Sequence, residues 1–310
     1  MKKILMPLFL LLAEGAEDRR IPVGGQAVIE GVLMKGPAQW GLSVRNPDGM
    51  IETETWSSRP WTSSMPWKLP LIRGVVTMIE MMTVGFRALD RSAQIAVGEE
   101  EKITAKEMFV TVAVAILAVV GLFIALPLWL SDLAVRAWGI GPLGKNILEG
   151  CARGIVFIAY VAGIGMWSEI RRVFRYHGAE HKTINAYEAG AEMTVAGIRN
   201  YSRIHPRCGT SFLLIVVAVS IVVFSLAGHG SILWRIGSRI VLLPLVMGIS
   251  YEIIKGASCA GVLGRILMAP AMSFQYITTR EPDESQIEVA LASLEAALGK
   301  KLGPVSEAAE

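Results

Sequence analysis

The sequence predicts an α-helical polytopic membrane protein, with about four transmembrane helices, interfacial amphipathic helices and a small N-terminal unit that contains a β-hairpin. Hydrophobic residues make up 53% of the 310 residues and charged residues 18%, whereas soluble domains have ~45–50% apolar and ~25% charged residues. The stretches 108–130 and 208–234 contain no charged residue. Each is longer than the ~20 residues that a helix needs to cross a bilayer.

Four spans are expected, at about 108–130, 147–168, 208–229 and 237–255. Residues 256–279 are also apolar, but Arg265 and Pro270 interrupt them, so we expect a helix in the membrane plane rather than a fifth span. The segment 169–207, between the second and third spans, carries seven Lys and Arg residues. Because positive charge favours the cytoplasmic side, we expect this loop and both chain termini in the cytoplasm, and the protein in the cell inner membrane.

The N-terminal part, 20–68, is predicted to be a β-rich unit in water. The stretch Asn46-Pro47-Asp48-Gly49 predicts a turn, because Pro fixes φ and Gly accepts a positive φ. Residues 50–56 alternate with period two and include β-branched side chains, which is typical of a strand. GVLMKG and WGLSVR are two further short strand candidates. The glycines of this unit match no phosphate-binding loop and are assigned to turns, at Gly24, Gly25, Gly31 and Gly36.

Two amphipathic helices flank the spans. Residues 69–97 place Arg73, Glu80 and Arg87 in one narrow polar line, so this helix lies in the membrane interface or packs against other helices. From Asp283 onward, apolar residues recur at helical spacing, which predicts a soluble amphipathic helix. The predicted segments are a flexible or interfacial N-terminus (1–19), the β-rich cytoplasmic unit (20–68), an amphipathic interfacial helix with its linker (69–107), the transmembrane domain (108–255) with its cytoplasmic loop (169–207), a membrane-associated segment (256–282) and the amphipathic cytoplasmic tail helix (283–310).

Composition argues against a nucleic-acid-binding protein and against a disulfide-stabilised one. The net charge is only +3, and no Lys/Arg run is interleaved with aromatic residues, so no nucleic-acid partner is predicted. The three cysteines are an odd number at scattered positions, which favours free thiols or a metal ligand over a disulfide framework. The first twelve residues resemble the start of a signal peptide. Pro7 breaks their apolar run and no clear cleavage site follows, so an interfacial N-terminus is favoured over a cleaved one.

The residues that could carry chemistry gather in the segment 169–207. His177-Gly178-Ala179-Glu180-His181 has the HxxEH pattern of one class of zinc proteases. On a helix, His177 and His181 lie one turn apart on the same face and can bind one Zn²⁺, while Glu180 could act as the catalytic general base on a metal-bound water. A catalytic zinc takes a third protein ligand and keeps its fourth position for water.

Three residues are candidates for that further ligand. His205 and Cys208 supply an imidazole and a thiol three residues apart, shortly after the motif. Glu252 lies near the end of the fourth span, which the predicted topology places at the same cytoplasmic face. Ionisable groups at a membrane boundary are costly unless they are paired or functional, so His205, Cys208 and Glu252 all stay candidates.

The alternative to a metal site is a structural polar network on a juxtamembrane helix. A pattern with three fixed positions often occurs by chance. In this alternative, Glu180 and the histidines pair with Arg171, Arg172 and Arg175. Gly178 inside the motif also lowers the helix propensity by ~1 kcal/mol relative to Ala. The residues alone leave both interpretations open.

Several longer stretches of the chain resemble a known family. They are GGQAVIEGVLMKGP, YHGAEHKTINAYEAG, HPRCGTSFLL, GISYEIIK and TTREPDESQIEVA, in this order. Over about residues 20–300 the sequence resembles the YqhQ-like membrane proteins of bacteria and chloroplasts, a family of unknown function that is labelled a predicted metal-dependent enzyme. That label rests on the same HxxEH pattern, so it adds no independent support. The resemblance implies a multi-span inner-membrane protein and supplies no substrate.

Three function classes follow from these observations. The first is a membrane scaffold or assembly factor, in which the β unit, the 69–97 helix and the tail helix bind protein partners or a second copy. The second is a zinc-dependent hydrolase of the HxxEH type at the cytoplasmic face. The third is an oligomeric channel or transporter, which ranks last because the first and third spans contain almost no polar groups. All three have the lipid bilayer as a partner.

Overall fold

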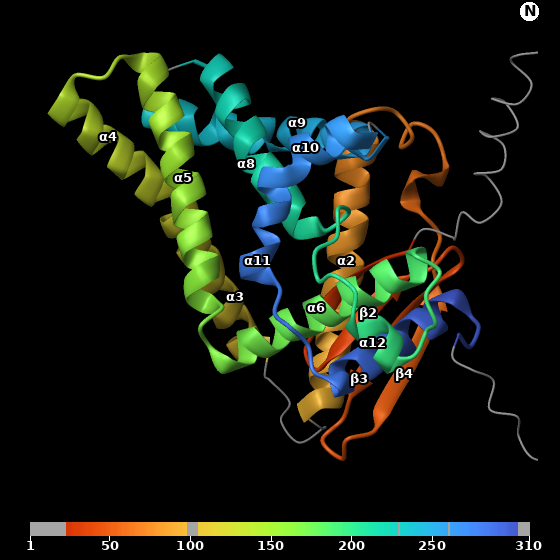
Figure 1. Cartoon of the computed structure of the whole chain (residues 1–310). Coiled ribbons are helices and arrows are strands. Elements are labelled where there is room, and N and C mark those ends of the chain that lie inside the picture. The colour runs from red at the N-terminus through yellow and green to blue at the C-terminus, as the bar shows by residue number, and fades with distance from the viewer. Residues whose placement is uncertain (1–22, 98–104, 229, 260, 303–310) are drawn as a thin grey trace, which may run out of the picture.

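The computed structural model describes residues 23–97, 105–228, 230–259 and 261–302. In these residues the chain is mostly helical, with four candidate membrane-spanning helices and an N-terminal antiparallel sheet of four strands (Figure 1). The predicted fold class is therefore confirmed. The segment 1–19, predicted to be a flexible or interfacial N-terminus, lies outside the described residues.

The sheet is a meander in which each strand pairs with the next one along the chain. Its strands are β1 (Gly24–Val28), β2 (Gly31–Lys35), β3 (Gln39–Arg45) and β4 (Ile51–Ser57). The predicted turn between β3 and β4 is confirmed, because Gly49 has a φ of +84° and the Asn46 side-chain oxygen accepts a 2.9 Å hydrogen bond from the Met50 amide. The assignment of Gly24, Gly25 and Gly31 to turns was wrong, since all three lie in strands.

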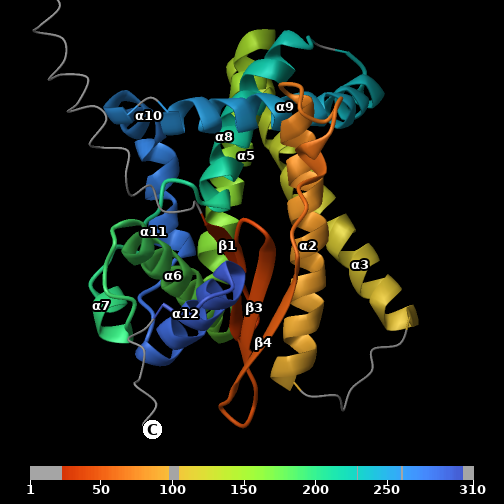
Figure 2. The same ribbon diagram turned by 90° about the vertical axis from the view of Figure 1, so that its right-hand side faces the viewer.

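Both faces of the sheet are covered by helices, because apolar residues of its inner strands point alternately to either side. Val32 and Met34 of β2 belong to a core shared with α6 (Ser168–Glu188) and α12 (Glu284–Leu298). Leu33, between them in the sequence, packs with residues of β3 and of α2 (Ile72–Val97) in the core on the opposite face. Figure 2 shows α6 and α12 on one side of the strands and α2 on the other.

The tail helix α12 is part of this core rather than a separate element. Asp283 caps its N-terminus in a capping box with Gln286. Ser293 donates a 2.9 Å hydrogen bond to the Gly41 carbonyl oxygen, and a Cβ added at Gly41 would lie 2.5 Å from the backbone nitrogen of Ala297. Only glycine allows the helix to approach β3 this closely. The apolar face of α12, the helix expected to bind partners under the scaffold hypothesis, is thus buried in the chain's own sheet.

Three separate stretches of sequence therefore form one α/β unit, at 23–57, 168–207 and 279–302. The segment 169–207, predicted to be a cytoplasmic loop, is mostly helical: it contains α6 and the short α7 (Val195–Arg199). Its polar composition is deceptive, because Tyr176, Ile184 and Ile198 are buried between the sheet and α12.

The four candidate spans agree with the predicted ones in number and order. They are Phe109–Trp138, Gly144–Ile164, Gly209–Leu226 and Ile236–Ala257. The first extends to Trp138 instead of ending near 130, because a π-helical turn, η3 (Gly121–Ala125), joins α3 (Ala105–Val120) to α4 (Leu126–Trp138) without a break. None of its most apolar 18-residue window is buried in the protein, which suggests a lipid bilayer around it.

The remaining spans belong to α5 (Pro142–Ile164), α8 (Gly209–Leu226) and α9 (Ile232–Cys259). In Figure 2, α9 runs across the view, whereas α5 and α2 run up and down it. The helix α10 (Gly261–Ser273) packs against α8 and α9 and is not among the candidate spans. The short α11 (Gln275–Thr278) then leads back to the α/β unit.

The helix α2 joins the apolar helices to the sheet. A Cβ added at Gly74, near its start, would lie 2.7 Å from the Tyr251 side chain of α9. A Cβ added at Gly85 would lie 2.8 Å from the Gln26 side chain of β1. One face of α2 therefore packs first on α9 and then on the sheet, next to the short η2 (Trp61–Ser63).

Candidate metal centre

Helix α6 presents both histidines of the HxxEH motif on one face. His177 and His181 are four residues apart, and their ring centroids lie 4.4 Å from each other. Between them, Gly178 faces the chain that leads to α12: a Cβ added there would lie 2.0 Å from the Arg280 carbonyl oxygen. The glycine that weakens the helix in isolation is thus required for the close approach of residues 278–282.

Cys208 completes a cluster of three possible ligands. It is the N-cap residue of α8, and its Sγ accepts a 3.4 Å hydrogen bond from the Thr210 amide. Its Sγ lies 3.2 Å from His177 Nε2. One ligand atom each from His177, His181 and Cys208 fall within 4.8 Å of one another. We call these three residues the His–Cys cluster.

Two backbone carbonyl groups determine which ring nitrogens face the thiol. His177 Nδ1 lies 2.9 Å from the Thr278 carbonyl oxygen, and His181 Nδ1 lies 2.7 Å from the Arg203 carbonyl oxygen. A carbonyl oxygen can only accept, so each Nδ1 carries a proton. In a neutral imidazole the Nε2 atom is then an acceptor, and a second partner on Nδ1 is the usual arrangement for a histidine that binds a metal.

The cluster has more acceptors than protons. A single thiol proton cannot satisfy the Nε2 atoms of both histidines, and His181 Nε2 is buried without a hydrogen-bond partner among the described residues. An unsatisfied buried acceptor costs free energy. A cation that accepts both nitrogen lone pairs and the sulfur would remove this cost. The donor set of two imidazoles and one thiolate suits Zn²⁺.

Burial and hydrogen bonds tune the cluster toward its metal-binding protonation state. His181 is 1% exposed, and burial lowers its pKa, so its ring is neutral at pH 7. Burial alone would raise the pKa of the Cys208 thiol. The Thr210 amide, which donates a hydrogen bond to Sγ, opposes this effect, and the thiol pKa lies below its ordinary value.

Glu180 lies on the buried side of the cluster. A Cβ added at Gly25 of β1 would lie 3.0 Å from Glu180 Oε1, so this glycine makes room for the carboxyl group. Burial is the main cause that raises the pKa of Glu180 to about 8, opposed by His177 and reinforced by Cys208. Its Oε2 is buried and has no hydrogen-bond partner among the described residues. A carboxyl with a strongly shifted pKa beside possible metal ligands is typical of a functional site.

Glu252 and His205 are not part of the cluster. The expectation for Glu252 needs correction: Arg73 Nε donates a 2.7 Å hydrogen bond to its carboxylate, and a second guanidinium nitrogen completes the pair. Helix α9 faces α2 at this point, which draws Glu252 toward Arg73. His205 is nearer, with its ring centroid 5.7 Å from that of His181, but its Nε2 faces Glu188 at 3.5 Å.

His205 instead helps to hold the turn before Cys208. The His205 amide donates a 2.8 Å hydrogen bond to Gln275 Oε1, and Gln275 Nε2 donates a 2.7 Å hydrogen bond to the His205 carbonyl oxygen. This buried clamp connects the turn at 205–208 to α11, which also supplies the Thr278 carbonyl group. Of the three candidates for a further ligand, only Cys208 lies within the cluster, whereas His205 holds the turn that precedes it.

Comparison with known proteins places the chain in a family. Residues 69–300 match the family described as "Protein of unknown function (DUF1385)". The chain belongs to this family. It is also 31% identical over 289 residues to the uncharacterized protein YqhQ of Bacillus subtilis (strain 168), a match that covers 87% of this chain and 90% of the relative. No solved structure matches.

The match of this DUF1385 protein contains the whole His–Cys cluster and Glu180, since 177–208 lies inside 69–300. The family and relative carry no assigned activity in their descriptions, so the chemistry has to be argued from the site.

Some residues of the site had a sequence signal and others had none. The carbonyl groups of Arg203 and Thr278 act through the backbone, so no side-chain pattern reveals them. Gly25 and Gly178 are different, because a glycine inside a strand or helix often marks a close approach. That signal was present at both positions.

Proposed function

We propose that this protein is a zinc-dependent hydrolase that acts at the membrane boundary. The proposal rests above all on the convergence of His177, His181 and Cys208, with both histidine Nδ1 atoms held by carbonyl oxygens. Zinc bound by three protein ligands keeps a fourth position open and lowers the pKa of a water molecule there to about 7.

The chain's own residues have distinct roles in this proposal. His177, His181 and Cys208 bind the ion, and the carbonyl groups of Thr278 and Arg203 orient the two imidazoles. Glu180 is the acid–base residue: its Oε2 takes a proton from the attacking water and delivers it to the leaving group. Burial raises the pKa of Glu180 to about 8, and a positive charge beside it would lower this pKa and favour the ionised form that a base requires.

The position of the cluster indicates the class of substrate. Cys208 directly precedes the candidate span Gly209–Leu226. His177 and Cys208 are partly exposed, whereas Glu180 and His181 are buried, so a substrate would approach from the side of the first pair. We therefore propose a peptide or lipid bond at the membrane surface, on the side that the positive charge of segment 169–207 predicts to be cytoplasmic.

The test is elemental analysis of purified full-length protein in three forms: wild type, the His177→Ala/His181→Ala double variant and Glu180→Gln. We expect about one zinc per chain in the wild type, loss of zinc in the double variant and full retention in Glu180→Gln. Fluorescent peptides and a fluorescent phospholipid in vesicles then serve as probes of hydrolysis. Glu180→Gln should reduce turnover by ~10²–10⁴-fold while it keeps its zinc.

Two results would contradict the proposal. One is zinc-free wild-type protein after growth with added zinc, with a melting temperature that shows it to be folded. The other is a Glu180→Gln variant that hydrolyses the responsive probe as fast as the wild type. The first result would rule out the metal site and with it the hydrolase. The second would rule out Glu180 as the catalytic base and leave the metal site in place.

A further inference from the structure

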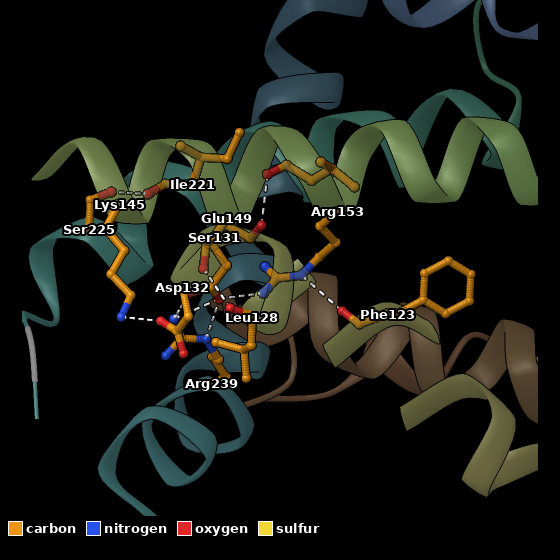
Figure 3. A network of polar contacts seen from close by, with 12 residues as sticks. Phe123, Leu128, Ser131, Asp132, Lys145, Glu149, Arg153, Ile221, Ser225 and Arg239 are labelled. Atoms are coloured by element: carbon orange, nitrogen blue, oxygen red, sulfur yellow. Dashed lines mark hydrogen bonds and ion pairs between the residues drawn. The ribbon is translucent and has the colours of Figure 1, made fainter. Parts of the chain in front are cut away.

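A second buried polar cluster lies among the candidate spans, away from the α/β unit. Glu149 of α5 is 2% exposed, and Arg239 of α9 donates to both of its carboxylate oxygens at 2.8 Å (Figure 3). Arg153, one turn further along α5, donates to the same carboxylate at 2.8 Å. Two guanidinium groups therefore share one glutamate inside apolar helices, where ionisable groups are costly and usually functional.

All four candidate spans contribute to this cluster. Arg153 Nε donates a 3.1 Å hydrogen bond to the Phe123 carbonyl oxygen in the π-helical turn of the first span. The Phe224 ring of α8 lies 5.6 Å from the Arg153 guanidinium and 5.4 Å from that of Arg239. Lys145 of α5 pairs with Asp132 of α4, as Figure 3 also shows. We call Asp132, Lys145, Glu149, Arg153 and Arg239 the span cluster.

The span cluster has an excess of positive charge. Lys145, Arg153 and Arg239 supply three cations, whereas Asp132 and Glu149 supply two anions. The formal sum over these described side chains is one positive charge. In a medium of low dielectric constant an uncompensated charge is unfavourable, so a bound anion would stabilise the arrangement.

Hydrogen-bond donors are in excess as well. Asn146 lies on the same face of α5 as Glu149 and Arg153 and is 8% exposed, and its side-chain Nδ2 has no partner among the described residues. The hydrogen bonds of Arg153 to described residues use Nε and Nη2, which leaves Nη1 without one there. Lys145 has three donor hydrogens, and its ion pair with Asp132 occupies one side of the ammonium group. These donors call for a ligand that is rich in acceptor oxygens.

We propose that the span cluster binds the phosphate group of an anionic membrane lipid. A phosphodiester carries one negative charge, which matches the surplus, and it is an acceptor for guanidinium, ammonium and amide donors. The location selects a lipid over a soluble anion. Lys145 is the second residue of its candidate span, and Trp138, the last residue of the first span, is 73% exposed, as expected for a side chain at the headgroup level.

The geometry of α5 places the donors along a path into the membrane. Lys145 and Arg153 are eight residues apart, which is about 12 Å along a helix. Lys145 and Asn146 contact the phosphate near the boundary, and Arg153 and Arg239 provide the positive field behind it. The span cluster shares no residue with the proposed hydrolase site, so either proposal can fail without the other.

Native mass spectrometry of the detergent-purified full-length protein tests this inference. The probes are phosphatidylglycerol, phosphatidylcholine with the same acyl chains, and inorganic phosphate as a competitor. The variants are Lys145→Gln and Asn146→Asp, which remove one positive charge or add one negative charge at the site. The matched control is Arg136→Gln, which removes an exposed positive charge from the last turn of α4. Melting temperatures establish that each variant is folded.

The wild type should bind phosphatidylglycerol about tenfold more tightly than phosphatidylcholine, a difference of about 1.4 kcal/mol. Lys145→Gln and Asn146→Asp should abolish the preference, and Arg136→Gln should keep it. Equal affinity of the wild type for the two lipids would overturn the proposal. Equal losses in Lys145→Gln and Arg136→Gln would do so too, because they would indicate general surface charge. Full displacement of the lipid by millimolar phosphate would assign the cluster to a free anion instead.

Discussion

The His–Cys cluster and the span cluster are both buried, polar and assembled from distant parts of the chain. They differ in what is missing: the first lacks hydrogen-bond donors, and the second lacks acceptors and negative charge. In the His–Cys cluster, acceptors outnumber protons, and His181 Nε2 remains without a hydrogen-bond partner among the described residues. In the span cluster, donors and positive charge are in excess, and Asn146 Nδ2 remains without a partner there. Buried polar groups are normally satisfied, so the sign of the excess indicates the ligand: a cation in the first case and an anion in the second.

The largest effect is expected from Glu149→Gln in the span cluster. The variant leaves Arg153 and Arg239 buried without their shared carboxylate, and removal of one partner from a buried ion pair costs about 3–5 kcal/mol. Thermal unfolding in detergent should show a large fall in melting temperature. The matched control is Glu252→Gln, because the Arg73–Glu252 pair is about one-quarter exposed. It should cost about 1 kcal/mol or less.

An equal fall in melting temperature in Glu149→Gln and Glu252→Gln would contradict the description of the span cluster as a buried site. It would mean that Glu149 sits in a solvated environment, where neither an excess of charge nor a missing anion has a large energetic effect.

The next effect concerns the backbone around the His–Cys cluster. Gly178→Ala places a methyl group against the Arg280 carbonyl oxygen, and overpacking of this kind costs about 1–3 kcal/mol. The shift also moves the Thr278 carbonyl group away from His177, and loss of such an outer partner lowers metal affinity ~10–100-fold. A competition titration with a zinc chelator measures the affinity.

Gly163→Ala is the control for that substitution. Gly163 is also in a helix, but a Cβ there would have no atom within 4 Å. The variant should leave zinc affinity unchanged and stabilise the protein by about 0.5–1 kcal/mol. An unchanged zinc affinity in Gly178→Ala would show that the Thr278 contact does not position His177.

A smaller effect is expected from pH in the zinc-free protein. The folded protein holds the Glu180 proton up to a pKa of about 8, whereas the unfolded chain releases it near 4.5. Between these values the folded state binds more protons, so its stability falls as pH rises. Melting temperatures of the wild type should therefore decline from pH 5 to pH 8 more steeply than those of Glu180→Gln, which has no proton to lose. Parallel curves would show that the Glu180 carboxyl is solvated.

The smallest effect is expected at the surface of the α/β unit. Glu288 pairs with Arg45 at 2.9 Å but is half exposed, and Arg45 also donates to the Gly49 and Ser285 carbonyl oxygens. Glu288→Gln should change stability by less than about 1 kcal/mol, as thermal unfolding would show. A cost similar to that of Glu149→Gln would contradict the distinction between buried clusters and surface pairs.

The apolar helices could be predicted from the sequence because their signal is local. A charge-free stretch such as 108–130 is sufficient to indicate a span. The turn at 46–49 was equally local, since Pro and Gly encode its backbone angles. The π-helical turn that extends the first span to Trp138 leaves no composition signal, so the helix end was set too early.

The assembly of the α/β unit could not be predicted in the same way. Its three parts, 23–57, 168–207 and 279–302, are far apart in the sequence, and an amphipathic helix such as α12 has the same pattern whether it covers a sheet, a membrane or a partner. The sequence therefore allows the tail helix to bind a partner, whereas in the structure the sheet buries its apolar face. The polar composition of 169–207 likewise gives no sign that the helix with the HxxEH motif is buried in the centre of the unit.

In the candidate site, too, the local features could be predicted from the sequence and the long-range contacts could not. The helical spacing of His177 and His181 predicted their shared face, and Cys208 was among the named partners. Glu252 is a candidate ligand because the predicted topology brings it to the same membrane face, but a topology cannot tell which neighbour a side chain contacts. Arg73 lies closer and is charged, and it binds Glu252 instead.

The central claim is that His177, His181 and Cys208 bind one zinc ion, and X-ray absorption at the zinc edge of the purified protein tests it most directly. The account predicts a coordination shell with two nitrogen ligands at ~2.0–2.1 Å and one sulfur ligand at ~2.3 Å. The sulfur contribution should be lost in Cys208→Ser and kept in Glu180→Gln. A shell of oxygen and nitrogen atoms alone in the wild type, or a sulfur contribution that persists in Cys208→Ser, would contradict the claim.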